Sequence, residues 1–188
     1  FACAWSALAV VVALVGCGAR QAPGAVDPTL KVQAAGVRFE VIDKRPAPAV
    51  ASREVLMWPG ELDPALQAKL NALCAGKGIQ LLVVARVNVA RATELVDSRG
   101  EMTRIAVELE FETRAADGTL FKRGSGHAQM DIPRDEASDD EVAEQLRLTA
   151  GDAFDRYWAL PATLGSLNRE LGAYAHKRAA PAQSAPTE

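Results

Sequence analysis

Few residues of this 188-residue chain have side chains suited to chemistry: there are three cysteines and two histidines. The spacing of Cys3, Cys17 and Cys74 fits neither a disulfide framework nor a zinc site. Cys74 lies beside a helical stripe of leucines, so we expect it to be a small buried thiol. His176 lies near the end of the chain, where we expect it to be solvated.

A row of glutamates could suggest a carboxylate site. Glu108, Glu110 and Glu112 alternate with apolar residues, which is also the pattern of a strand with one wet face, and we favour this second interpretation. We expect His127 to face Glu108 as an exposed cross-strand pair and not as a general base. No hydrolase, metalloprotease, nucleotide-binding or redox motif occurs in the sequence. The sequence therefore predicts a non-enzymatic protein without cofactor, metal or catalytic residues.

Cys17 has a different context. Residues 1–16 carry no charge, and the apolar run Ala4–Val15 is about 12 residues, too short to span a bilayer but typical of a signal-peptide core. Leu14-Val15-Gly16-Cys17 ends this run and resembles the bacterial lipobox, in which small residues admit the peptidase and the Cys thiol accepts a diacylglycerol. A buried helix with a chance cysteine, or a signal peptide cut elsewhere, is the alternative.

From this motif we expect a signal peptide over residues 1–16 whose positively charged start precedes Phe1. Cys17 would become the lipidated first residue of the mature chain, with an S-linked diacylglycerol and an N-linked acyl chain such as palmitate, enough for stable anchoring. Leu14, Val15 and Gly16 would be the peptidase recognition residues, and residues 17–34 a flexible tether. Gly18, in place of Asp, favours the periplasmic face of the outer membrane over that of the inner membrane.

The remaining composition predicts one folded domain. Apolar residues make up 49% of the chain and charged residues 24%, and the net charge is −3. An acidic balance of this kind gives no footprint for binding nucleic acid. We expect a single periplasmic domain over residues 35–176 and a disordered tail over residues 177–188.

The periodicity of the sequence predicts an α+β fold with a mainly antiparallel sheet in β-α-β-β-β-α order and two or three helices packed on one face. Residues 36–43 alternate as a first strand, and Asp63 is expected to cap a helix that stops at Gly76 or Gly78. A strand follows over residues 79–91. Ser138 starts a long helix that Pro161 ends, before a shorter third helix.

Residues 103–131 predict a hairpin with Asp117-Gly118 as a two-residue turn. The register that follows pairs large with small residues on one face, as in Phe111 with Gly124, which explains the Gly124-Ser125-Gly126 stretch without a phosphate loop. On the other face it pairs charges in a complementary way: Glu112 with Arg123, Glu108 with His127, and Arg104 with Asp131. For the preceding loop we expect a three-residue turn, Arg99-Gly100-Glu101, that keeps Leu95 on the face of Ile105.

Three residues are weak candidates for binding. Asp43 and Arg45 follow the first strand and are expected to form a local ion pair at its end, with ligand binding as the second interpretation. Trp58 follows an apolar stretch and either caps the core or marks a partner surface. Leu148 is an apolar residue on the polar face of the long helix, which is a hint of an interface or a scattered exposed leucine.

The order of these pieces resembles the YajG-type family of small bacterial lipoproteins. The matching segments are VRFEVIDKR (37–45), ALQAKLNALCAGKGIQLLVV (65–84) and the hairpin around Asp117-Gly118, after the lipobox-like motif. This resemblance implies an envelope lipoprotein and supplies no catalytic residues. A weaker likeness to LptE-type lipoproteins implies a factor that binds or assembles lipid or lipopolysaccharide. We therefore expect a non-catalytic periplasmic interaction or scaffold module that binds the membrane through acylated Cys17 and another envelope protein, with the lipid factor as the alternative.

Overall fold

The computed structural model describes residues 31–43, 45 and 55–179. Strand β1 (Gly36–Asp43) is followed by helix α1 (Leu62–Leu73) and by the strands β2 (Gln80–Asp97), β3 (Gly100–Ala115) and β4 (Leu120–Pro133). A short 3-10 helix (Arg134–Glu136) leads to α2 (Asp139–Trp158) and α3 (Pro161–Ala179). The sheet order is β1-β2-β3-β4, with β1 parallel to β2 and the other pairs antiparallel. This confirms the predicted fold class.

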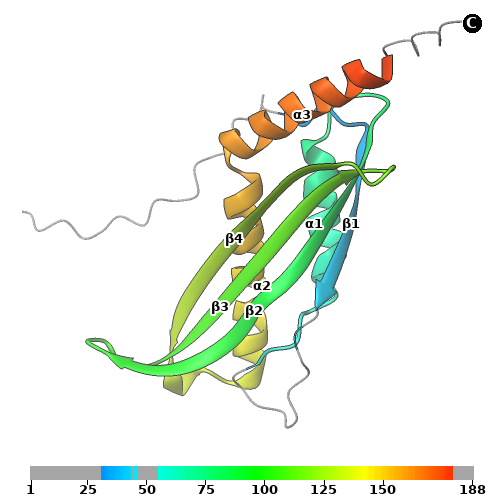
Figure 1. The fold of residues 1–188 in the computed structure, drawn as a ribbon. Coiled ribbons are helices and arrows are strands. Elements are labelled where there is room, and N and C mark those ends of the chain that lie inside the picture. Colours follow the sequence, from blue (N-terminus) through cyan, green and yellow to red (C-terminus); the bar gives the residue numbers. More distant parts are fainter. Residues whose placement is uncertain (1–30, 44, 46–54, 180–188) are drawn as a thin grey trace, which may run out of the picture.

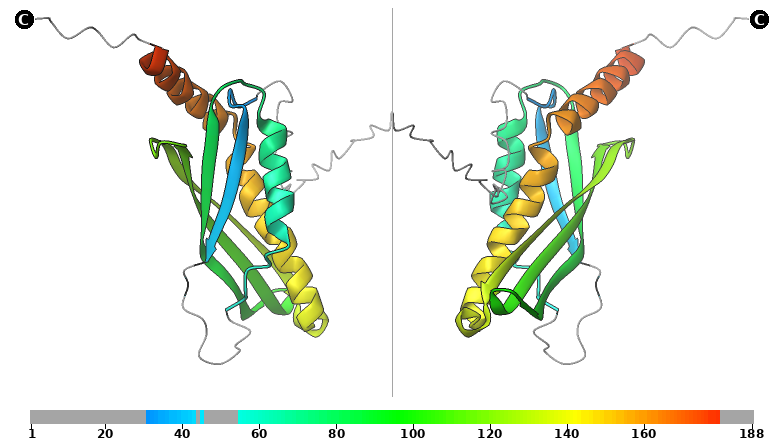
Figure 2. Two further views of the ribbon diagram at one scale, coloured as in Figure 1. Left: turned by 90° about the vertical axis from the view of Figure 1, so that its right-hand side faces the viewer. Right: turned by 90° about the vertical axis from the view of Figure 1, so that its left-hand side faces the viewer.

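The helices leave one face of the sheet open. Helices α1 and α2 lie on the same face, α1 against β1 and α2 against β3 and β4, while α3 crosses the end of the sheet (Figure 1). Views from the two sides show α1 and α2 together on one side of the sheet (Figure 2). The face turned toward the viewer in Figure 1 is called the outer face below, and no helix of the described residues covers it.

The core forms where α2 packs on the predicted hairpin. Phe111 and Phe154 are fully buried and meet edge to face at 5.8 Å between ring centroids, and Tyr157 stacks on Phe111 at 4.9 Å. Gly124 pairs with Phe111 across the strands and leaves the space that the Tyr157 ring occupies. The predicted large-to-small register is thereby confirmed.

Several helix boundaries differ from the prediction. Ser138 caps α2 as expected, its Oγ accepting the Glu141 N–H at 3.2 Å. Helix α1 begins at Leu62 after Glu61, and Asp63, the predicted cap, instead accepts a hydrogen bond from the indole of Trp58. Pro161 starts α3, because its fixed φ and missing N–H suit a first helical position. Helix α3 runs to Ala179, so residues 177–179 are helical and not part of a tail.

Both hairpin turns differ in length from the prediction. The β2–β3 turn was predicted to have three residues and the β3–β4 turn two, and the structure shows the reverse. Asp97 pairs with Gly100, so the β2–β3 turn has two residues, and a bulge between Val87 and Val89 supplies the shift that we had assigned to the turn. Leu95 pairs with Met102 and therefore lies on the opposite face from Ile105, contrary to the prediction.

The β3–β4 turn has three residues, not two. The Ala115 N–H donates to the Thr119 carbonyl at 2.8 Å, the Gly118 N–H donates to the Ala115 carbonyl at 3.0 Å, and Gly118 has φ +86°. A register shift between Thr113 and Arg114 then restores the predicted pairing in the rest of the hairpin.

The folded part begins before residue 35. Val32 and Ala34, which we expected in the tether, are 2% and 0% exposed, and the Val32 N–H donates to the Leu73 carbonyl at 2.8 Å. The motif residues Leu14, Val15, Gly16 and Cys17, most of the predicted tether and residues 180–188 lie outside the described residues.

Candidate interaction surface

The outer face carries several ion pairs between neighbouring strands. Strand alternation places Glu108, Glu110 and Glu112 of β3 on this face, beside Arg86 of β2 and Arg123 of β4. The row of glutamates is thus the wet face of the strand that the sequence predicted. Within the described residues, no group of three or more His, Cys, Asp or Glu side chains is arranged to hold a metal ion.

Glu112 is the centre of an ion-pair cluster on this face. Although it points away from the helices, it is only 4% exposed, because three arginines cover it. Its carboxylate lies 3.0 Å from Arg86, 2.9 Å from Arg114 and 2.9 Å from Arg123. Hydrogen bonds from Arg86 and then Arg114 lower the pKa of Glu112 to about 2, against a desolvation effect that raises it. The sequence predicted only the Arg123 pairing.

A second cluster lies near the β2–β3 turn. Asp131 pairs with Arg104 at 2.7 Å, as predicted, and also with Arg99 at 2.7 Å. Hydrogen bonds from Arg104 and then Arg99 lower the pKa of Asp131 to about 2, despite partial burial. Asp97 holds Arg99 from the same turn at 2.6 Å. The two-residue turn places Arg99 within reach of Asp131. The three-residue turn expected from the sequence did not predict this ion pair.

His127 faces Glu108 across β3 and β4, as the register predicted. Glu108 accepts a 3.5 Å hydrogen bond from the side chain of Asn88, which lies at the β2 bulge. His176 lies exposed near the end of α3. Cys74 is half-buried, its Sγ donates to the Leu70 carbonyl at 3.5 Å, and burial raises the pKa of its thiol, which makes the reactive thiolate rarer.

Asp43 and Arg45 form a clamp at the end of β1. Trp58 is half-buried against the core, and its indole donates to Asp63 of α1. Arg45 donates to both oxygens of Asp43, to the Ala90 carbonyl at 2.6 Å and to the Leu56 carbonyl at 2.8 Å. Arg45 therefore ties the end of β1 to β2 and to the chain that leads into α1, and its hydrogen bonds lower the pKa of Asp43. These contacts confirm the predicted ion pair, and ligand binding by the three residues stays a prediction.

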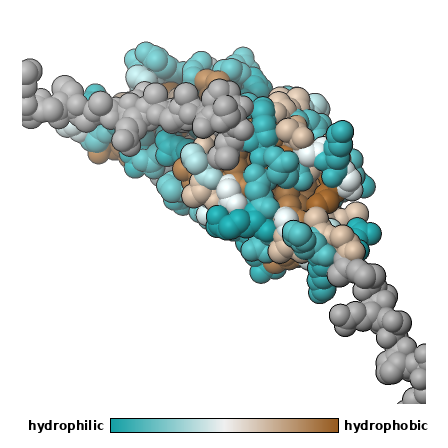
Figure 3. Space-filling model, turned by 90° about the horizontal axis from the view of Figure 1, so that it is seen from above, coloured by the Kyte–Doolittle hydropathy of each residue, from teal (hydrophilic) through white to brown (hydrophobic). Residues whose placement is uncertain are grey.

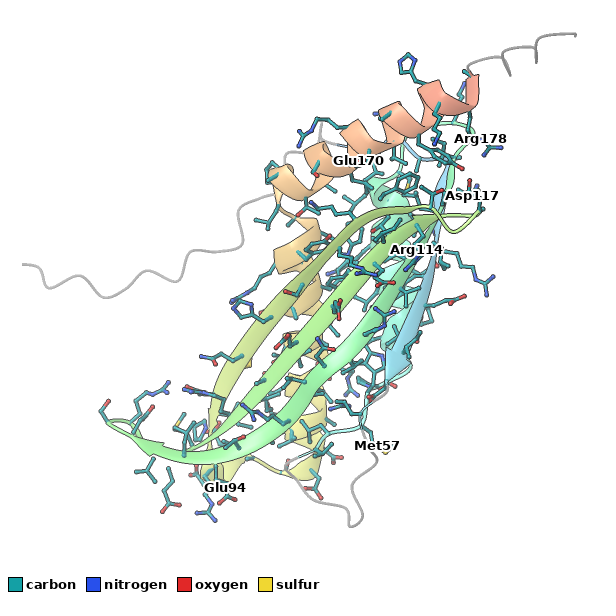
Figure 4. All side chains as sticks on the ribbon, viewed as in Figure 1. Met57, Glu94, Arg114, Asp117, Glu170 and Arg178 are labelled. Carbon is teal, nitrogen blue, oxygen red and sulfur yellow. The ribbon has the colours of Figure 1, made fainter. Side chains whose placement is uncertain are left out.

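A contact that the sequence did not predict joins α3 to the β3–β4 turn. The Tyr174 hydroxyl donates to Asp117 at 2.7 Å and accepts from Arg178 at 3.2 Å, and the Tyr174 ring meets Phe121 edge to face. The hydrogen bond from Tyr174 is the main cause that lowers the pKa of Asp117 to about 2. Asp117 and Arg178 approach each other at this end of the molecule (Figure 4).

A surface cavity of about 720 Å³ lies beside the β2–β3 turn. Its lining is mostly charged: Arg99, Glu101, Met102, Pro133, Arg134 and Asp135. Arg134 pairs with Glu101 at 2.9 Å, so part of this charge is internally neutralised.

Exposed apolar side chains are scattered. Met57, Leu148 and Leu160 are 84%, 48% and 51% exposed, on the segment before α1, on α2 and at the α2–α3 junction. Leu148 thus lies in solvent, as either of its two interpretations requires. Seen from the α3 end, hydrophilic residues dominate, with smaller apolar areas between them (Figure 3).

Comparisons with known proteins give distant structural likenesses only. No family model and no curated protein matches the sequence. Among solved structures, the chain is similar to a minor lipoprotein from Acinetobacter baumannii, with 12% identity, TM-score 0.36 and coverage of 77% of this chain and 95% of that one. It is also similar to a Xanthomonas campestris protein of the DUF330 family, with 12% identity, TM-score 0.40 and coverage of 79% and 97%.

A lipoprotein described as putative, from Caulobacter crescentus CB15, has 15% identity, TM-score 0.35 and coverage of 74% and 91%. At these identities and TM-scores the likenesses establish neither a family nor a function. None of the helices in the described residues is long and apolar enough to cross a bilayer.

Proposed function

We propose that the chain is a lipid-anchored lipoprotein of the bacterial envelope, whose folded part is a non-catalytic interaction module on the periplasmic face of the outer membrane. The observation that carries this proposal is Leu14-Val15-Gly16-Cys17 at the end of a charge-free apolar run. Diacylglycerol on the Cys17 thiol and acylation of its amino group would provide the two or three chains that stable anchoring needs.

The uncovered sheet supports the interaction role. The outer face carries ion pairs, and no described helix covers it. On such a polar surface, the pattern of charges can favour one binding partner over others and raise the rate of association with it. The Glu112 and Asp131 clusters hold its arginines in fixed positions, so little side-chain entropy is lost on binding. The partner we propose is another envelope protein.

Metabolic labelling tests the anchor. In a Gram-negative host fed an alkyne-bearing palmitate analogue, the chain expressed with its complete leader should carry the label and sediment with outer membranes. Cys17→Ala should lose both properties, and Cys74→Ala should keep them as the matched cysteine control. Label and membrane association that survive Cys17→Ala would contradict the proposal.

Photo-crosslinking tests the interaction surface. A photoreactive amino acid at position 106, on the outer face, should capture an envelope protein in intact cells. The same amino acid at position 170, on α3, serves as the control on another surface. Capture only from position 170 would contradict the assignment of the outer face.

The alternative is a module that binds or assembles lipid or lipopolysaccharide. It rests on the LptE-like order of elements. Specific binding of lipopolysaccharide by the acylated protein in a detergent micelle, lost on substitution of cavity residues, would favour this alternative over a protein partner.

A further inference from the structure

Strand β4 has a long backbone edge that no described residue pairs. The Ala115 N–H donates to the Thr119 carbonyl, which shows that odd-numbered β3 residues turn their backbone groups toward β4. Because hydrogen-bonded pairs alternate along an antiparallel ladder, the register then turns the even-numbered residues of β4 toward β3. The N–H and carbonyl groups of its odd-numbered residues point outward: Arg123, Ser125, His127, Gln129 and Asp131.

The opposite edge of the sheet is handled differently. On β1, the Val37 N–H donates to Asn71 at 3.3 Å, the Phe39 N–H donates to Gln67 at 2.7 Å, and the Val37 carbonyl accepts from Gln67 at 2.6 Å. Two side chains of α1 thus occupy hydrogen-bonding positions that another strand would need. Free edges are usually blocked in this way or by proline, bulges or short length.

The free edge of β4 has few of these protections. From residue 122 to residue 132 the strand contains no proline, and the register with β3 is uninterrupted. Its charged residues on this stretch, Lys122, Arg123 and Asp131, are of both signs. A second strand can therefore extend the sheet there without breaking any hydrogen bond of the described fold.

We propose that this strand is β4 of a second copy, and that two copies form a two-fold antiparallel β4–β4 pair centred on His127. In this register Arg123 lies opposite Asp131 of the second copy, and Ser125 lies opposite Gln129. All of these residues turn their backbone groups to the shared edge, so each facing pair can exchange two hydrogen bonds.

The side chains fit this register on both faces. Arg123 is 58% exposed while it contacts Glu112, so it keeps donors for a further carboxylate. The Asp131 carboxylate accepts three hydrogen bonds, from Arg99 and Arg104, of the roughly four that it can take. On the helix face, Gly126 lies opposite Ala128 and Gly124 opposite Met130, so no pair of large side chains meets. A two-fold axis normal to the sheet also leaves the helices of both copies on one face.

Disulfide trapping tests the pair in intact cells with the full chain. Residues that face each other in such a ladder have Cα atoms about 5.5 Å apart, within reach of a disulfide. Mild oxidation of His127→Cys should give a covalent dimer, as should the double variant Ser125→Cys/Gln129→Cys, whose two positions face each other. Gln129→Cys alone should give little, because the two copies of residue 129 lie four residues apart along the pair.

Two further variants separate edge pairing from chance collision. Ser125→Pro removes an N–H that points to solvent in the described fold, a position where an edge strand tolerates proline. In the His127→Cys background it should abolish the covalent dimer, whereas Ser125→Ala should retain it. Arg38→Cys, on the capped β1 edge, and the parent chain with its native cysteines set the background.

Three results would overturn the proposal. The first is a folded His127→Cys chain that stays monomeric, which would include the case of an edge covered by another part of the same chain. The second is equal trapping by Gln129→Cys and His127→Cys. The third is undiminished trapping after Ser125→Pro in a variant that still unfolds cooperatively. The test does not depend on the anchor, because Cys17→Ala should leave the trapped dimer in place.

Discussion

The backbone of Gly126 in β4 lies directly against the carbonyl oxygen of Ala153 in α2, with no room for a side chain between them. Helix α2 therefore packs on bare strand backbone at this point. Close approach here lets Phe154 and Tyr157 reach Phe111, so the aromatic core depends on a glycine in the neighbouring strand.

Gly126→Ala should destabilise the fold by about 1–3 kcal/mol or more, because the added methyl would overlap backbone and force α2 outward. Denaturant unfolding of the full chain measures this loss. Gly151→Ala is the matched control: a Cβ there meets nothing within 4 Å, and alanine in a helix should stabilise by roughly 0.5–1 kcal/mol. Equal effects of the two substitutions would disprove the close approach.

Gly124→Ala should also destabilise, but by a different contact, since its methyl would meet the Tyr157 ring. The hydroxyl of Tyr157 has no hydrogen-bond partner among the described residues, so a shorter side chain leaves no polar atom stranded. Tyr157→Leu should therefore recover part of the loss from Gly124→Ala, with a coupling of about 0.5–3 kcal/mol in a double-mutant cycle. It should not rescue Gly126→Ala, where the obstacle is a carbonyl.

Glu112→Gln should lower stability at neutral pH by about 1–3 kcal/mol, because three arginines lose a buried charged acceptor. The folded pKa of about 2 lies below the ordinary value of 4.5, so the contribution is present above pH 4.5 and is lost as the pH falls toward 2. Unfolding free energies of parent and variant should converge over this acid range. Glu110→Gln, on the same strand face, is the control and should lower stability at neutral pH by less.

Tyr174→Phe should raise the pKa of Asp117 from about 2 toward its ordinary value of 3.8, because the phenol is the main donor to this carboxylate. An NMR titration of the Asp117 side-chain carboxyl carbon measures the shift. The ring contact with Phe121 remains in the variant, so α3 should stay docked. A pKa that does not move would show that Tyr174 does not hold Asp117 in solution.

Arg45→Ala should speed hydrogen exchange of the Leu56 N–H, which donates to the Ala90 carbonyl at 3.0 Å. Arg45 contacts both of these residues, so its removal frees the segment before α1 from β2. Arg45→Lys keeps the charge but lacks the planar fork, and should restore little protection. Arg38→Ala, at an exposed pair with Glu40, should leave exchange at Leu56 unchanged.

Much of the fold followed from local patterns. Alternation with a buried face fixes which residues of β3 and β4 can pair, since a slip of one residue would turn Phe111 and Leu109 into solvent. That constraint predicts the facing pairs Glu112–Arg123 and Arg104–Asp131 from the sequence alone. The Ser138 cap and the bounds of β1 likewise depend on neighbouring residues only. The lipobox-like motif at Cys17 is a sequence feature, and it alone carries the proposed anchor.

Tertiary structure decided what local patterns leave open. Either a loop or a bulge can supply a one-residue shift, and the strands place one shift at the β2 bulge and the other beside the β3–β4 turn. Arg86 covers Glu112 because β2 lies next to β3, which hairpin pairing alone does not specify. Gln67 and Asn71 cap β1 because α1 packs beside it, whereas no described side chain caps β4. Each of these outcomes depends on contacts between segments that are far apart in the sequence. The residue pattern along a single strand does not determine which distant segment packs against it.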